Sequence, residues 1–235
     1  MPRLYLIGTN HMDLRGPERL EKLLQSYRPT YICLETTQED AKRRVRDHQT
    51  SQREAPSIRM FTAVYGKEAV DNILAFQNAM GYEIWVPHEY QQDRTYVQII
   101  YLDERTEQDF QYARQKINER TGEIVDLHGK PTERLIEELL KLDRAKMQQA
   151  TDNSYLDTST GIGKDFTQQE FDRFVIGSDD RIEPKLRYLF QTAQPDDVID
   201  YVGGVLHIFG DYRNLYERLK DLNPQRVRLV EADKI

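Results

Sequence analysis

A pattern that occurs twice, near the two ends of the chain, constrains the fold more than any other feature of this sequence. An apolar run leads into Gly8-Thr9-Asn10-His11, and a second leads into Gly204-Val205-Leu206-His207. In each copy a helix-like stretch and another apolar run follow, and that run ends at Glu35 or at Glu231, 24 residues after the histidine (35 − 11 and 231 − 207). We interpret the pattern as an internal repeat of a β-α-β unit, and we expect the two units to build one shared site.

Apolar runs and amphipathic stretches alternate along the rest of the chain. Strands are predicted at 3–8, 30–35, 83–86, 96–102 and 227–230, and helices at 17–27, 66–80, 106–120, 132–150, 167–175 and 181–193. The stretch 36–59 is predicted to be either a charged helix or a mobile loop, and 151–164 a polar connection. The alternation favours an α/β fold with a mostly parallel central sheet. Residues 1–235 would then form one domain, with a helix-rich insertion or cap at about 104–180.

Composition narrows the class of protein. The 235 residues are enough to bury a large core, and the single cysteine, Cys33, lies in an apolar run, so we expect a core thiol and no disulfide. A net charge of −7 argues against a nucleic-acid partner, because binding phosphates requires a basic surface. The first apolar run is too short for a signal peptide, and no segment has the roughly 18 apolar residues that span a membrane. We therefore expect a cytoplasmic protein without a membrane partner.

The candidate site follows from where an α/β sheet binds ligands. Ligands gather beyond the carboxyl ends of parallel strands, and His11, Glu35 and His207 each come directly after a predicted strand. Two imidazoles and a carboxylate suit a divalent metal ion, manganese, cobalt or zinc, and leave positions open for water or substrate. A metal-bound water has a lowered pKa and can attack a carbonyl carbon, with Glu35 acting as general base or as a further ligand.

The same residues resemble a known family. Leu6-Ile7-Gly8-Thr9-Asn10-His11, the segment from Arg28 to Glu35, and the segment from Tyr201 to His207 are similar to the TraB/PrgY/Tiki family, which has paired Gly-x-x-His motifs and a glutamate at the end of the second strand. Its fold is thought to be related to erythromycin esterase and to ChaN-like proteins. The resemblance implies a metal-dependent hydrolase, either a peptidase or a peptide-inactivating protein, with a peptide or small ester as substrate.

The resemblance also implies an arginine upstream of the second motif. Arg181 lies 23 residues before Gly204 (204 − 181), at the spacing of the family arginine, and would stabilise a developing oxyanion or hold a substrate carboxylate. Arg144, in Leu142-Asp143-Arg144-Ala145-Lys146-Met147, matches the Arg-x-x-Met form that often accompanies this arginine, but it lies 60 residues before Gly204 (204 − 144).

Two other functions remain open at this point. The chain would be a binding protein if it keeps the fold and sequesters a peptide without cleaving it. It would be a metal-independent, esterase-like hydrolase if one histidine acts as general base, as the resemblance to erythromycin esterase implies. For each histidine taken alone, the alternative is a structural side chain bonded to the backbone.

The remaining polar residues have less specific patterns. His88 follows the predicted strand 83–86 and is a candidate further ligand, whereas His48 and His128 lie in polar runs typical of a surface. Glu231 lies close to the polar end of the chain and is predicted to be solvated. The basic cluster from Lys42 to Arg46 is typical of an exposed helix face, and would alternatively steer an acidic peptide or a phosphate.

Overall fold

A central parallel sheet organises the molecule, as the alternating pattern predicts. The computed structural model describes residues 1–51, 62–63, 65–104, 108–109, 111–112, 115–116, 119, 137–138, 140–158 and 167–235. The sheet has the strand order β3-β2-β4-β1-β5, and every pairing is parallel. Its strands are β1 (Arg3–Thr9), β2 (Tyr31–Leu34), β3 (Gln98–Tyr101), β4 (Val198–Gly204) and β5 (Gln225–Arg228). The expected α/β class with a parallel central sheet is confirmed.

The two repeat units interlock in this sheet. The first unit runs from β1 through α1 (Gly16–Tyr27) to β2, and the second runs from β4 through α11 (Leu206–Phe209), α12 (Leu215–Arg218) and η3 (Lys220–Leu222) to β5. Strands β1 and β4 are adjacent, while β2 lies beyond β4 and β5 lies beyond β1. The two crossovers therefore run in opposite directions, and right-handed crossovers of that kind must cover opposite faces of the sheet.

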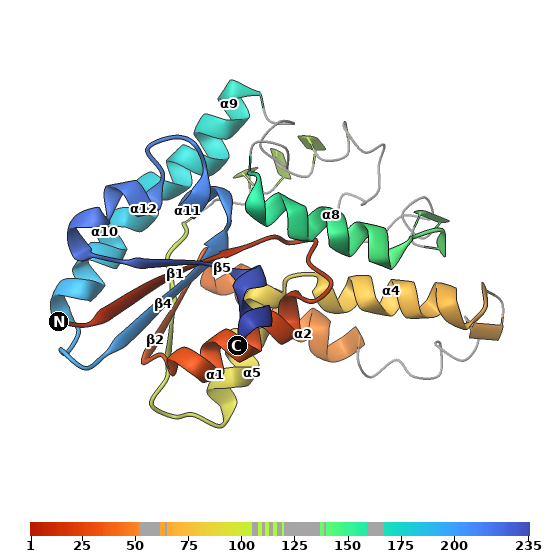
Figure 1. Ribbon diagram of the computed structural model, residues 1–235, viewed down its shortest axis with the longest axis horizontal. Coiled ribbons are helices and arrows are strands. Elements are labelled where there is room, and N and C mark those ends of the chain that lie inside the picture. Colours follow the sequence, from red (N-terminus) through yellow and green to blue (C-terminus); the bar gives the residue numbers. More distant parts are fainter. Residues whose placement is uncertain are drawn as a thin grey trace.

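The buried residues show that the crossovers do cover opposite faces. Leu20, Leu23 and Leu24 of α1 pack in one core cluster with Ile7 and Val202, whereas Leu215 and Leu219 pack in the other cluster with Leu6 and Tyr201. The same division is visible in Figure 1, where α1 and α5 lie on one side of the sheet and α10 to α12 on the other. An approximate two-fold axis parallel to the strands thus relates the units, and it brings both Gly-x-x-His motifs to one end of the sheet.

One predicted strand is wrong. Residues 83–86 belong to α5 (Tyr82–Gln92), which follows α4 (Lys67–Ala79) after Met80 and the left-handed Gly81, where φ is 68°. Ile84, Trp85 and Val86 are all buried, so their apolar run lacks the periodicity that would separate a helix from a strand. Packing of α5 against α1 and α2 (Gln38–Ser51) outweighs the β-propensity of these side chains. Of the stretch 36–59, residues 38–51 form the helix that is one of its two predicted forms, and residues 52–59 lie outside the described residues.

The boundaries of the predicted helix 132–150 are wrong over the residues that the structure describes. A new helix, α8 (Arg144–Leu156), begins after Asp143, whose carboxylate accepts a hydrogen bond from the Lys146 amide at 3.1 Å. It therefore extends into the stretch predicted as a polar connection, and it buries Thr151 and Tyr155. Residues 131–136 and 159–166 lie outside the described residues. Of the predicted helix 106–120, the described residues 108–109, 111–112, 115–116 and 119 are helical.

The last helices and the end of the chain differ from expectation in smaller ways. The helices predicted at 167–175 and 181–193 are continuous, as α9 (Gln168–Phe171), a π-helical turn (Asp172–Ile176) and α10 (Gly177–Thr192). The strand predicted at 227–230 ends at Arg228, and a 3₁₀ segment (Leu229–Lys234) follows it. Within the described residues, no helix is both long enough and apolar enough to cross a membrane.

Candidate functional site

His11 lies in the turn that follows β1, with its ring at the surface. Its side chain is 68% exposed, but its Nδ1 lies 2.5 Å from Oε1 of Glu83, a residue of α5 whose side chain is only 10% exposed. Attraction by the Glu83 carboxylate outweighs partial desolvation and raises the pKa of His11. Burial raises the pKa of Glu83, but the charge and hydrogen bond of His11, a backbone hydrogen bond and the charge of Arg44 together outweigh burial and lower that pKa. Both shifts favour the charged form of the pair, and Nε2 of His11 is on the edge of the ring away from Glu83.

His207 lies in the helical turn α11 after β4 and is buried. Its Nδ1 is 2.7 Å from Oδ1 of Asp179, a residue of α10, and its Nε2 is 3.0 Å from Oε1 of Glu35. Burial opposes a charge on this ring, but the two carboxylates outweigh burial and raise the pKa of His207 to about 10. Asp179 is fully buried and also accepts a hydrogen bond from the Tyr212 hydroxyl at 3.0 Å.

Glu35 joins the two repeat units. It follows β2 in the first unit, and its carboxylate accepts hydrogen bonds from the Gly204 amide at 3.1 Å and from the Tyr201 hydroxyl at 3.3 Å in the second unit. Ser178 of α10 donates a third at 3.2 Å, beside the contact with His207. Gly203 makes room for this arrangement, because a Cβ at that position would lie 2.2 Å from the Tyr201 hydroxyl oxygen. Glu35 also contributes to the raised pKa of His11, so it acts electrostatically on both histidines.

The two histidines have the same kind of contact at Nδ1. In each, Nδ1 contacts a buried carboxylate supplied by a helix outside the repeat, Glu83 from α5 or Asp179 from α10. Such a partner fixes the orientation of an imidazole ring and directs Nε2 toward the site. The structure brings Glu35 of the first unit into contact with His207 Nε2 of the second, and the charge of Glu35 also acts on His11. A site shared by the two histidines stays a prediction.

Comparison with protein-family models, with curated proteins and with solved structures finds no match for this chain. The similarity to the TraB/PrgY/Tiki family stays a prediction that depends on the quoted motifs.

The predicted metal site can be compared with the donors that are present. Histidine ligands of metals normally donate their second ring N–H to a carboxylate, and both histidines here have that partner. The kinds of donor therefore fit a divalent ion held by His11, His207 and Glu35. Within the described part of the chain, no three His, Cys, Asp or Glu side chains are arranged to hold a metal ion. Metal binding stays a prediction.

The two candidate arginines lie in different places. Arg181 of α10 donates from Nε to Oδ1 of the buried Asp103 at 3.2 Å. The Asp103 amide bonds to the carbonyl of Thr36, the residue after Glu35, so Arg181 lies at the same end of the sheet as the histidines. Arg144 begins α8 and lines a different hollow, of about 920 Å³, together with Leu14 and Asn72. The structure thus brings Arg181, and not Arg144, to the side of Glu35, and its role stays a prediction.

Two interpretations of the other histidines are corrected. His88 does not follow a strand but lies within α5, where its Nδ1 contacts the Ile84 carbonyl at 2.7 Å and its Nε2 contacts the Tyr101 hydroxyl at 3.0 Å. Both nitrogens are engaged, and burial lowers the pKa of His88, so its contacts are those of a structural residue. His48 is not at the surface, because it is buried and stacks on Trp85 with ring centroids 3.9 Å apart. His128 lies outside the described residues.

The remaining predictions concern charged residues and the thiol. Arg43 and Arg44 of the basic cluster both pair with Asp40, and the positive charge of Arg44 also acts on His11 and Glu83. Glu231 is 3.6 Å from Arg228 with its side chain 38% exposed, which agrees with a solvated position. Cys33 is fully buried, and burial raises the pKa of its thiol, as expected for a core residue.

Sequence reasoning missed both carboxylates that hold the histidines. Glu83 lies in a segment predicted as a strand, and Asp179 lies before the predicted start of a helix, so neither is in a recognisable motif. Their only signal is indirect, because a charged residue inside an otherwise apolar run, such as Glu83 before Ile84-Trp85-Val86, requires a charged or hydrogen-bonding partner when it is buried.

Proposed function

We propose that this protein is a hydrolase in which His11 is the general base that activates water. The observation that carries the proposal is the pairing of His11 Nδ1 with the buried Glu83 carboxylate, while the ring itself is exposed. A carboxylate that orients an imidazole and stabilises its protonated form is the arrangement found in hydrolytic enzymes with a histidine base. Of the hypotheses from sequence, this arrangement best supports the esterase-like one.

The chemistry requires no residue beyond those at this end of the sheet. Nε2 of neutral His11 accepts a proton from water while the water oxygen bonds to the carbonyl carbon of an ester or amide. The bond from that carbon to the leaving oxygen or nitrogen then breaks, and the protonated His11 returns the proton to the leaving group. Because the raised pKa of His11 favours the protonated form, the base is most active above its usual titration range.

The second histidine has a different part in this proposal. His207 is charged and has a carboxylate at each nitrogen, so it neutralises Glu35 and Asp179 and holds β2, β4 and α10 together at the site. Glu35 already accepts bonds from several donors, which makes it less suited to accept a proton from water than His11. In the metal-dependent alternative, His207 would be neutral, and His11, His207 and Glu35 would hold a divalent ion in place of the His207–Glu35 ion pair; the ion would lower the pKa of the attacking water.

The proposal is tested with a panel of chromogenic esters and labelled peptides, each incubated with the purified protein in chelator and with manganese, cobalt or zinc. We expect turnover in chelator, and we expect His11→Asn to lower kcat by about 10²-fold or more, the usual contribution of a general base. Lys22→Ala on the exposed surface of α1 is the control and should match the unmodified protein.

Three outcomes separate the hypotheses. Turnover that His11→Asn leaves unchanged would overturn the role of His11. Turnover that appears only with added metal, and is lost in both His11→Asn and His207→Asn, would favour the metal-dependent hydrolase. A peptide that binds and emerges intact under every condition would favour the sequestering protein.

A further inference from the structure

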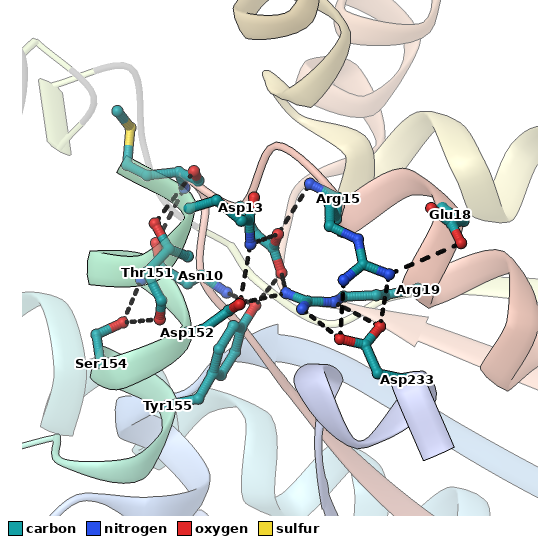
Figure 2. A network of polar contacts seen from close by, with 12 residues as sticks. Asn10, Asp13, Arg15, Glu18, Arg19, Thr151, Asp152, Ser154, Tyr155 and Asp233 are labelled. Atoms are coloured by element: carbon teal, nitrogen blue, oxygen red, sulfur yellow. Dashed lines mark hydrogen bonds and ion pairs between the residues drawn. The ribbon is translucent and has the colours of Figure 1, made fainter. Parts of the chain in front are cut away.

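The turn that carries His11 is bonded on both sides to a helix from the middle of the chain. The Asn10 amide donates to the Tyr155 hydroxyl at 2.9 Å, and the Asn10 side chain donates to Ser154 Oγ at 2.8 Å. On the other side of His11, the Thr151 hydroxyl lies 3.5 Å from the Met12 carbonyl. Each of these partners belongs to α8. Figure 2 shows the turn lying against this helix.

The Tyr155 hydroxyl is the centre of the contact. It accepts the Asn10 amide and donates to Oδ2 of Asp13 at 3.0 Å, so one oxygen atom joins the residue before His11 to the second residue after it. Tyr155 is fully buried, and the Tyr82 hydroxyl donates to the Asn10 carbonyl at 3.2 Å beside it. A buried hydroxyl that bonds to both sides of the turn favours one arrangement of that turn.

A buried arginine continues the network away from the turn. Arg19 of α1 has no exposed side-chain surface, and its guanidinium donates to Asp13 at 2.9 Å, to Asp152 at 2.7 Å and to Asp233 at 2.6 Å. Figure 2 shows the guanidinium between Asp13 and Asp233. A buried cation with three carboxylates has one preferred geometry, because any displacement leaves a charge without a partner.

We propose that Asp13, Arg19 and Tyr155 form a positioning network that sets the place of His11 relative to Glu83. This inference rests on the proposed function, because a general base must be held at one place to act on a bound substrate. The network has two ends. Asp13 and Tyr155 are bonded at the His11 turn itself, whereas the bonds of Asp233 among the described residues go to Arg15 and Arg19, on the far side of the guanidinium.

This inference makes α8 part of the site. The helix contributes no side chain to the contacts of His11 itself, yet it determines where the His11 turn lies. The middle segment of the chain, predicted as a helix-rich insertion or cap, would therefore act on the site through the contacts of α8 with the His11 turn.

The test compares two variants at the two ends of the network. Tyr155→Phe removes one oxygen atom beside the turn, and Asp233→Asn removes one charge at the far end. The readout is the imidazole Nδ1 proton of His11 in proton NMR, because a short bond to a carboxylate shifts such a proton downfield and slows its exchange with water. The corresponding proton of His207, bonded to Asp179, is the internal reference. Signals are assigned with His11→Asn and His207→Asn.

We expect Tyr155→Phe to broaden or abolish the His11 signal and to leave the His207 signal unchanged. Asp233→Asn should lower the melting temperature and leave both signals in place. Equal loss of the His11 signal in both variants, or its retention in Tyr155→Phe, would overturn the positioning role and leave a network that only stabilises the fold.

A substrate, once found, provides a second readout. Tyr155→Phe should lower kcat by about 10-fold or more with little change in KM, because a small displacement of a reacting group is costly to the rate. The NMR readout does not depend on turnover, so a positioned His11 in a protein without hydrolase activity would overturn the proposed function and leave the positioning inference intact.

Discussion

The two repeat units have the same backbone plan and different chemistry. In both, a parallel strand ends in Gly-x-x-His, and in both the histidine Nδ1 contacts a buried carboxylate. His207, however, is 7% exposed and has a carboxylate at Nε2 as well, whereas the side chain of His11 is 68% exposed. Equivalent positions of the two units thus serve differently, one as a buried ion pair and the other as an accessible group.

The glutamates of the two units differ in the same way. Glu35 contacts the histidine of the other unit, as the two-fold arrangement of the sheet allows. Its counterpart Glu231 does not reach His11, because β5 ends at Arg228 and the 3₁₀ segment carries Glu231 away from the strand direction. Glu83, from outside the repeat, is the carboxylate that His11 contacts instead.

The largest expected effect is on stability, and it separates the histidines. His207→Ala leaves Glu35 and Asp179 without their shared cation and should lower the free energy of unfolding by about 3–5 kcal/mol, the usual cost of breaking a buried pair. His11→Ala leaves one buried carboxylate, Glu83, without its cation, whereas His207→Ala leaves two, so His11→Ala should cost less, about 1–3 kcal/mol. Urea denaturation of both variants measures the difference, and equal effects would contradict the assignment of the two roles.

The stabilisation by His207 should depend on pH in a defined direction. Its pKa is raised to about 10 in the folded protein, against roughly 6.5 in an unfolded chain. The stabilisation of the fold by protonated His207 is therefore complete below about pH 6.5, and it is lost as the pH rises toward 10. The difference in unfolding free energy between the unmodified protein and His207→Ala should shrink over that range.

The next effect is on activity and concerns the carboxylates. Glu83→Gln keeps the size of the side chain but removes the charge that stabilises protonated His11, so kcat should fall by roughly 10²-fold for any substrate found with the panel above. The matched control is Glu89→Gln, the same change at an exposed position of α5, which should leave kcat unchanged. Full activity of Glu83→Gln would show that His11 acts without this partner.

Asp200, a buried acid in β4, should have a smaller effect on stability, and it is a further difference between the two units. Asp200 lies seven residues before His207, where the first unit has Leu4 seven residues before His11. Both oxygens of Asp200 are buried without a hydrogen-bond partner in the described structure, and burial raises its pKa well above the usual range. Asp200→Leu should raise the free energy of unfolding by about 1–3 kcal/mol at neutral pH, because it removes an unsatisfied polar group.

The sign of the pH dependence tests this interpretation. Asp200 holds its proton in the folded protein, whereas an unfolded aspartic acid loses it above roughly pH 4. The unmodified protein therefore loses stability as pH rises above that value, and the gain from Asp200→Leu should be larger at pH 8 than at pH 4. A gain that is the same at both values would point to packing alone.

The smallest effect is expected at the end of the second unit. Glu231→Gln should change the free energy of unfolding by less than about 0.5 kcal/mol, as for most exposed positions. Glu35→Gln, at the equivalent position of the first unit, removes the charge that faces His207 and should cost several times more. Equal effects would mean that the units are more alike than their contacts indicate.

The predictable part of the site is the part that depends on strand ends. The Gly-x-x-His motifs place His11 and His207 after β1 and β4, and parallel pairing of those strands brings both to one end of the sheet. Glu35 is predictable for the same reason. Spacing favours Arg181, whereas the Arg-x-x-Met form favours Arg144, and it is the packing of α10 beside Asp103 that brings Arg181 to this end of the sheet.

The amino-acid sequence by itself determined the parallel sheet, its two repeat units and the end at which their histidines emerge, because those features follow from local periodicity and from the handedness of crossovers. Only the tertiary structure decided which carboxylate each histidine contacts, that residues 83–86 form a helix, and that α8 supports the His11 turn. The contacts of the His11 turn with Glu83 and with α8 join residues more than 70 positions apart, the His207–Asp179 contact joins residues 28 apart, and residues 83–86 of α5 are buried on every side. None of these relations leaves a pattern in neighbouring residues.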